Sequence, residues 1–207
     1  MLAIGIPNPL YEATLGNFSR GESSNLTNNL SFYWFINDHL QLQSQFSVTK
    51  SDTEDNNFTD PLSTKYSSQD NPFTRGDLSV SSTDNFSWNV NAFLAYNNSI
   101  GKNYLNLSLG INAQENQTSS LSSQYRGFPS GALHSPNYAQ EIYQKPSTNE
   151  GSSRLFSAFG TINYSYQNIY LFDLTGRIDG SSKFGADKKY APFWSTGIGI
   201  NIHNYPF

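Results

Sequence analysis

The chain has 207 residues, a formal net charge of −4, 14% charged residues and no cysteine. The acidic balance argues against a nucleic-acid-binding protein, which would present a basic face. The absence of cysteine excludes disulfides, thiolate metal sites and a cysteine nucleophile. Strong helix formers are scarce, which excludes a helical bundle. No apolar run is long enough for a transmembrane helix, and residues 1–6 lack the positive region of a signal peptide.

Apolar and polar residues alternate in seven segments, as they do in strands that present two different faces. In one of them Phe86, Trp88 and Val90 alternate with Ser87 and Asn89. Each segment has about 10 residues, the length at which a strand tilted by about 45° crosses a bilayer. Strands of soluble proteins usually have about 5–6 residues. The predicted strands cover residues 26–36, 39–48, 86–96, 104–113, 154–166, 169–179 and 193–203.

The connections between these segments alternate between short and long. The short ones lie at residues 37–38, 97–103 and 167–168. Outer-membrane barrels show this alternation, with short periplasmic turns and longer extracellular loops. The long connections cover about 50–84, 115–153 and 180–192.

Charged residues are almost confined to the long connections and to the first 24 residues. Inside the strand cores the charged residues are Asp173 and Arg177, with Asp179 at the rim, and all three share the polar parity of their strand. Since a Lys or Arg facing lipid at the midplane costs about 2–4 kcal/mol, this parity predicts that the three side chains face the lumen of a barrel.

Aromatic residues gather at two levels along the predicted strands, as in the girdles at the two membrane interfaces. Those near the short turns are Trp34, Tyr96, Tyr104, Tyr164, Tyr166 and Tyr170. Those near the opposite ends are Phe46, Phe86, Trp88, Phe156 and Trp194.

These patterns predict an all-β fold, with about seven long antiparallel meander strands forming an incomplete segment of a transmembrane β-barrel. Residues 1–24 form an N-terminal extracellular-side segment in this interpretation, and residues 25–207 form the partial barrel. The alternative is a secreted or surface β-sandwich that acts as a binding or adhesion module, with the aromatic residues packed in its core.

Several stretches resemble the barrel of SusC/RagA-type TonB-linked outer-membrane transporters, the TonB-dependent receptors. The resemblance is strongest over residues 152–207 and looser over residues 8–115. The stretches that carry it are Asn8–Tyr11, Ser153–Gly160, Asn163–Leu171, Asp179–Gly185, Ala191–Ser195 and Gly199–Asn204.

The resemblance implies a plugged barrel of about 22 strands in the bacterial outer membrane. Such a barrel is energised through TonB, imports oligosaccharides or peptides, and carries a SusD-like surface lipoprotein as a lid. The chain shows no recognisable plug and no TonB-contacting segment. Seven strands cannot close a barrel of this size, so we expect a fragment that is non-functional alone. Its partners would be membrane lipid, the remainder of the barrel and plug, the SusD-like lipoprotein and TonB.

Catalytic motifs are missing, so no enzymatic activity, cofactor or metal site is expected, and the three histidines lie far apart. The lumen-facing candidates are Asp173, Arg177 and Asp179. Aromatic and basic residues of the long connection at 115–153 could stack on sugar rings or peptide side chains. They could equally pack the loop against itself or against a lid protein. The candidates for substrate or partner contact are Tyr125, Arg126, Phe128, Tyr138 and Tyr143.

Overall fold

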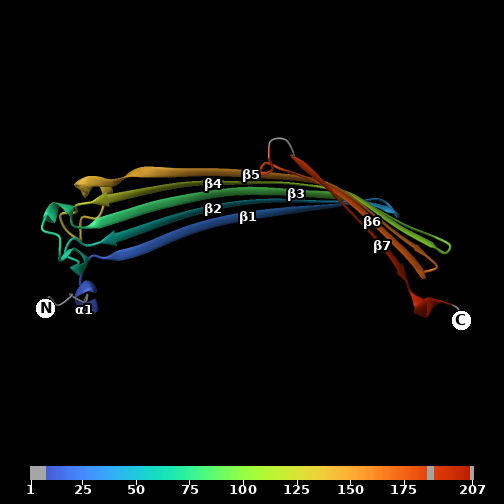
Figure 1. Cartoon of the computed structure of the whole chain (residues 1–207), viewed down its shortest axis with the longest axis horizontal. Coiled ribbons are helices and arrows are strands. Elements are labelled where there is room, and N and C mark those ends of the chain that lie inside the picture. The colour runs from blue at the N-terminus through green and yellow to red at the C-terminus, as the bar shows by residue number, and fades with distance from the viewer. Residues whose placement is uncertain (1–7, 186–188, 206–207) are drawn as a thin grey trace. The chain divides into compact units, whose positions relative to one another are not determined.

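The computed structural model describes residues 8–185 and 189–205, and seven strands account for most of them (Figure 1). The strands are β1 (Phe18–Asn37), β2 (Leu40–Thr59), β3 (Asp77–Ile100), β4 (Asn103–Arg126), β5 (Glu141–Tyr166), β6 (Tyr170–Ser181) and β7 (Tyr190–Ile200). The helical elements are α1 (Pro9–Glu12) and the 3₁₀ turns η1 (Thr64–Tyr66), η2 (Pro72–Thr74), η3 (Pro136–Tyr138) and η4 (Ile202–Asn204). In the part of the chain that is described, no helix is long and apolar enough to cross a membrane.

All seven strands belong to one sheet, in which their spatial order is their order in the sequence. The predicted meander of seven strands is therefore confirmed. The alternative of a β-sandwich is wrong for the described residues, because a sandwich needs a second sheet packed on the first. The pairs β5–β6 and β6–β7 are antiparallel throughout.

The first five strands are much longer than predicted. They have 20 to 26 residues each, instead of about 10. The predicted long connections 50–84 and 115–153 were therefore too wide, since they shrink to residues 60–76 and 127–140. Most residues of the added strand ends are polar on both faces, so a search for alternation does not detect these ends.

Three further boundaries differ from the prediction. The first strand begins at Phe18, inside the predicted N-terminal segment 1–24, of which residues 1–7 lie outside the described residues. The third long connection, predicted at 180–192, covers residues 182–189, of which 186–188 are also outside them. The last strand, predicted to reach residue 203, ends at Ile200, and residues 202–204 form η4.

The short turns have the backbone that tight hairpins require. Gln167 and Asn168 both have a φ of 56°, and Gly101 has a φ of 60°. Positive φ values match the twist of paired strands, and Asn and Gly adopt them most readily. At the first turn the side-chain oxygen of Asn37 accepts hydrogen bonds from the backbone N–H of His39 and of Leu40.

The chain divides into two compact units. The loop-end unit comprises Met1–Asn25, Ser51–Asn85 and Thr118–Gly151. The turn-end unit comprises Leu26–Lys50, Phe86–Gln117 and Ser152–Phe207. The first five strands contribute residues to both units.

A small apolar cluster stabilises the loop-end unit. Phe58, Leu78 and Phe128 are each 3% exposed, and the ring of Phe128 meets that of Phe58 edge-on, with 5.1 Å between centroids. The cluster joins strands β2 and β3 to the connection after β4. Partly buried side chains pack around it, namely Phe18, Val80, Tyr125 and Ala139.

In the turn-end unit the apolar side chains line up on one face of the sheet and remain exposed. Directly paired residues point to the same face, and Phe172 of β6 pairs with Tyr164 on one side and with Ile198 on the other. Trp194 and Ile198 are 78% and 85% exposed. A contiguous apolar surface of this kind is rare on soluble monomers. The face needs an apolar environment outside the chain.

Candidate functional site

The loop-end unit contains a polar cavity of about 450 Å³, in which the candidates Tyr125, Arg126 and Tyr143 meet. Strand alternation places Asp77 on the same side of β3 as Ser87 and Asn89, which is the polar side. The cavity therefore opens on the polar face of the sheet. Its polar lining includes Asn57, Thr59, Lys65, Asp77, Arg126 and Tyr143.

Asp77 is the centre of the polar contacts at this cavity. Its Oδ2 accepts hydrogen bonds from Tyr66 Oη at 2.7 Å and from Lys65 Nζ at 2.8 Å. Its Oδ1 accepts one from Arg126 Nε at 3.3 Å. Asp77 thus ties the loop after β2 to the end of β4.

These contacts shift the pKa of both acidic groups. Partial burial favours the neutral carboxyl, but hydrogen bonds from Lys65 and Tyr66 and the Lys65 charge outweigh it, so the pKa of Asp77 lies below its ordinary value. Burial, together with the hydrogen bond to Asp77, raises the pKa of the Tyr66 hydroxyl. Asp77 is therefore a carboxylate at neutral pH, and Tyr66 is a neutral donor to it.

Arg126 lies between Asp77 and an aromatic ring. Its guanidinium carbon is 3.3 Å from the centroid of the Tyr143 ring, which is a cation–π contact. Tyr143 remains 46% exposed. The arrangement places a guanidinium group against an aromatic ring in the lining of the cavity.

The other two loop candidates lie elsewhere. Phe128 is buried in the apolar cluster, so it packs the loop against itself and is not available to a substrate in this structure. Tyr138, in η3, is 46% exposed and lines a separate cavity of about 490 Å³ together with Phe73 and Phe128.

Sequence reasoning missed Lys65, Tyr66 and Asp77 as members of the polar cavity. All three fell inside the predicted connection 50–84, where no periodicity distinguishes one polar residue from another. Only the pairing of β3 with β4 brings Asp77 to Arg126, and that alignment cannot be read from spacing.

The predicted lumen-facing residues of β6 lie in the turn-end unit and share one face. Arg177 Nε pairs with Asp179 Oδ1 at 2.6 Å, and its Nη2 donates to the fully buried Ser157 Oγ at 3.2 Å. Asp173 instead accepts a hydrogen bond from Asn163 Nδ2 at 2.5 Å. The three residues therefore make two separate contacts on the polar face.

No group of three or more His, Asp or Glu side chains among the described residues is arranged to hold a metal ion.

The fold and its faces define a class of protein, which is a segment of a transmembrane β-barrel. No family model matches the chain. TonB-dependent receptor P3 of Formosa agariphila is 34% identical over 111 residues, which are 53% of this chain and 11% of the relative. TonB-dependent receptor SusC of Bacteroides thetaiotaomicron is 31% identical over 127 residues, which are 59% of this chain and 12% of the relative. The chain thus spans about a tenth of the length of these curated relatives.

The fold is similar to that of two solved structures over 99% of the chain. A structure of the RagAB peptide transporter matches with a TM-score of 0.86 at 20% identity, and the match covers 23% of that chain. The RagAB peptide importer in the open-open state matches with a TM-score of 0.84 at 21% identity, over 22% of that chain. In sequence and in fold, the chain resembles one segment of the barrel of SusC- and RagA-type TonB-dependent receptors of the bacterial outer membrane.

Proposed function

We propose that the chain forms part of the wall of an outer-membrane TonB-dependent transporter that imports oligosaccharides or peptides. The observation that supports this most strongly is the single sheet with an exposed apolar face, whose fold matches the barrel of a peptide transporter over 99% of the chain. The apolar face meets membrane lipid, and the polar face lines the lumen.

Substrate contact in this proposal falls to the polar cavity at the loop end. Tyr125, Arg126 and Tyr143 line it, and the Arg126–Tyr143 pair offers a stacking surface beside hydrogen-bonding groups. Aromatic rings and guanidinium groups bind flat or polar solutes with little loss of side-chain freedom, because Asp77 already holds Arg126 in place. Tyr138 is a second candidate, at the neighbouring cavity.

Arg177, Asp179 and Asp173 have a different role in this proposal. Arg177 and Asp179 compensate each other's charge, and hydrogen bonds hold Arg177 to Ser157 and Asp173 to Asn163 on the polar face. They form part of the hydrated surface of the lumen, along which a polar solute passes. Binding and conformational gating suffice for such transport, so no bond chemistry is assigned to these residues.

The segment works with partners in this proposal. In the described sheet β1 and β7 are the edge strands, and an unpaired edge cannot face hydrocarbon. The remaining strands of the barrel must therefore pair with both edges, and the segment alone transports nothing. A plug, TonB on the periplasmic side and a SusD-like lipoprotein over the loop end complete the proposed assembly.

The test is energy-dependent uptake. The longest form that the gene encodes is produced in a strain of its own species from which the gene has been deleted. Uptake of labelled oligosaccharides and labelled peptides is measured with and without a protonophore. We expect uptake of one of the two classes, abolished by the protonophore and by deletion of TonB.

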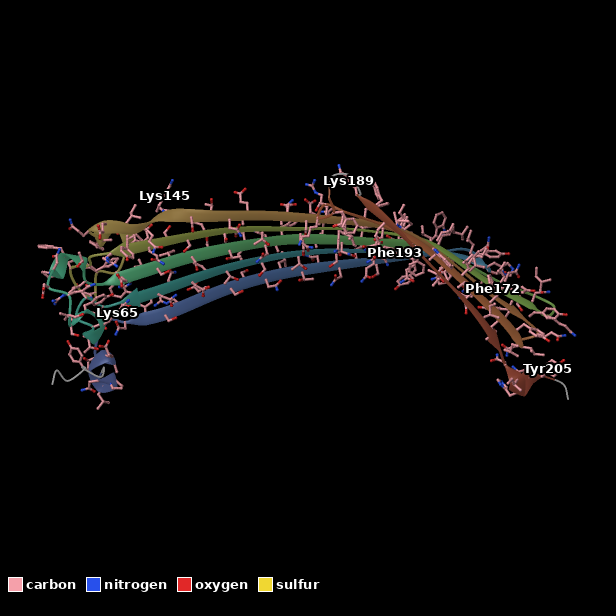
Figure 2. The ribbon with its side chains drawn as sticks, viewed as in Figure 1. Lys65, Lys145, Phe172, Lys189, Phe193 and Tyr205 are labelled. Carbon is pink, nitrogen blue, oxygen red and sulfur yellow. The ribbon has the colours of Figure 1, made fainter. Side chains whose placement is uncertain are left out.

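The double substitution R126Q/Y143A addresses the cavity. It should lower the apparent affinity for that solute by about tenfold, the effect of losing one strong stacking or charged contact. The control is K145Q, which removes an exposed cation of β5 that does not line the cavity (Figure 2). Uptake that does not depend on TonB would refute the transporter, whereas unchanged affinity in R126Q/Y143A would refute only the assignment of the cavity.

A further inference from the structure

A cavity of about 520 Å³ in the turn-end unit opens on the apolar face of the sheet. Three of the residues that line it are paired across β5, β6 and β7. Phe156 lies opposite Gly180, and Gly180 lies opposite Tyr190. A Cβ at Gly180 would overlap the Tyr190 ring, so the ring lies across the glycine. Trp88 and Arg154 also line the cavity. Arg154 is two residues before Phe156 and so points to the same, apolar face.

Two cationic side chains, Arg154 and Lys189, line the cavity. Arg154 Nε contacts Glu115 Oε1 at 2.8 Å, yet 69% of the Arg154 side chain is exposed. Glu115 is 11% exposed at its side chain and also accepts a hydrogen bond from Trp88 Nε1 at 3.3 Å. Glu115 therefore holds the Arg154 guanidinium in place through its Nε, while most of the Arg154 side chain remains exposed. Lys189, directly before β7 (Figure 2), adds a second exposed cation, and no acidic residue is among those that line the cavity.

The register gives the level of this cavity in the membrane. Tyr166 and Tyr170 form the pair next to the turn. Phe156 lies ten residues before Tyr166 in β5, away from the turn. Ten residues extend about 33 Å along a strand, which corresponds to about 25 Å of membrane at the usual tilt, the height of the apolar band of a barrel. The row of Phe156 and Tyr190 therefore lies at the far interface, where lipid headgroups begin.

We propose that this cavity binds the phosphate-bearing headgroup of a lipid in the outer leaflet. Arg154 and Lys189 bind the phosphate, and Trp88, Phe156 and Tyr190 contact the first methylene groups of the acyl chains. The inference rests on the membrane orientation in the proposed function, but not on transport. Charge complementarity and the outward position both favour a lipid over a solute from the lumen.

The test compares lipid binding by the wild-type protein and by R154Q/K189Q. The longest form that the gene encodes is purified and placed in phosphatidylcholine nanodiscs. Diphosphoryl lipid A is titrated in, and binding is followed by native mass spectrometry. We expect the double variant to bind about tenfold more weakly, the loss of one charge-assisted hydrogen bond or more. The matched control K102Q/K145Q removes two cations outside the cavity and should bind as the wild type does.

Further measurements separate the possible failures. R154K/K189R keeps both charges and should restore most of the binding, which a purely structural defect would not allow. Dephosphorylated lipid A should bind wild type and variant equally. Equal binding of diphosphoryl lipid A by wild type and R154Q/K189Q would overturn the proposal, as would equal competition by inorganic phosphate, which would indicate a soluble-anion site. TonB-dependent uptake, measured separately, reports on the transporter and not on this site.

Discussion

Glu12 shows how one half-buried carboxylate can fix a terminal segment. Its Oε1 accepts hydrogen bonds from the Thr64 backbone N–H at 2.7 Å and from the Thr64 hydroxyl at 2.6 Å. Its Oε2 accepts one from Ser63 Oγ at 2.9 Å. The hydrogen bonds from Thr64, followed by those from Ser63 and Asn17, lower the pKa of Glu12 from 4.5 to about 2. The carboxylate thereby joins α1 to η1.

This contact should depend on pH. Because the pKa of Glu12 is lower in the folded state, its stabilising effect is complete above about pH 4.5 and is lost as the pH falls towards 2. Amide exchange at Thr64, corrected for the intrinsic rate, should therefore show falling protection through this window. In E12Q the protection should already be low at neutral pH and should change little below it. The control E22Q, on β1, should follow the wild type, and an E12Q profile identical to the wild type would contradict this account.

At the same scale, the polar cavity shows what sequence reasoning can and cannot provide. Arg126 and Tyr143 could be singled out because aromatic and basic residues are concentrated in their segment. Their contact could not be predicted, since it depends on where β4 and β5 align. Phe128 and Tyr143 are both aromatic residues of the same predicted loop, so the sequence does not distinguish them. Only the burial of Phe128 shows that it packs in the apolar cluster, whereas Tyr143 stays exposed.

At the scale of the strand, glycine and aromatic residues fit together across neighbouring strands. Gly110 of β4 lies beneath the ring of Phe159 of β5, where a Cβ would overlap three ring atoms. Phe159 has the polar parity of its strand, opposite Arg177. The glycine therefore makes room for an aromatic ring on the polar face.

We expect G110A to lower the free energy of unfolding by about 1–3 kcal/mol, the usual cost of overpacking. The measurement is urea-induced unfolding of the reconstituted protein, followed by the gel mobility of the folded form. In the double variant G110A/F159A the cost of the alanine should largely disappear, which a double-mutant cycle quantifies. G176A is the matched control, because a Cβ there meets nothing within 4 Å. Equal effects of G110A and G176A would contradict the packing argument.

The strand ends explain the largest error of the sequence-based prediction. In β1 and β2 the extensions are joined by polar cross-strand pairs, Ser19 with Asn57 at 2.6 Å and Ser23 with Thr53 at 3.4 Å. Alternation reports a difference between two faces, and here most residues of both faces are polar. The backbone ladder continues regardless, because its hydrogen bonds do not depend on side-chain polarity.

At the scale of the whole chain, the sequence predicted the features that a strand needs in order to cross a membrane. The seven strands, their order and their tight turns follow from alternation and from short polar connections, and the structure confirms them. The extent of the strands, the apolar cluster around Phe58 and the cavities depend on contacts between distant segments. Patterns within one segment carry no information about such contacts.

The central claim is that alternate residues of the strands face lipid, and the lack of cysteine makes it directly measurable. Single cysteines are introduced along β6, and nitroxide labels on them are tested in native outer membranes for collision with oxygen and with a water-soluble nickel complex. Labels at Phe172, Leu174 and Ile178 should be accessible mainly to oxygen, and labels at Asp173, Thr175 and Arg177 mainly to nickel. A series in which every position is equally accessible to nickel, or in which the two sets are exchanged, would contradict the account.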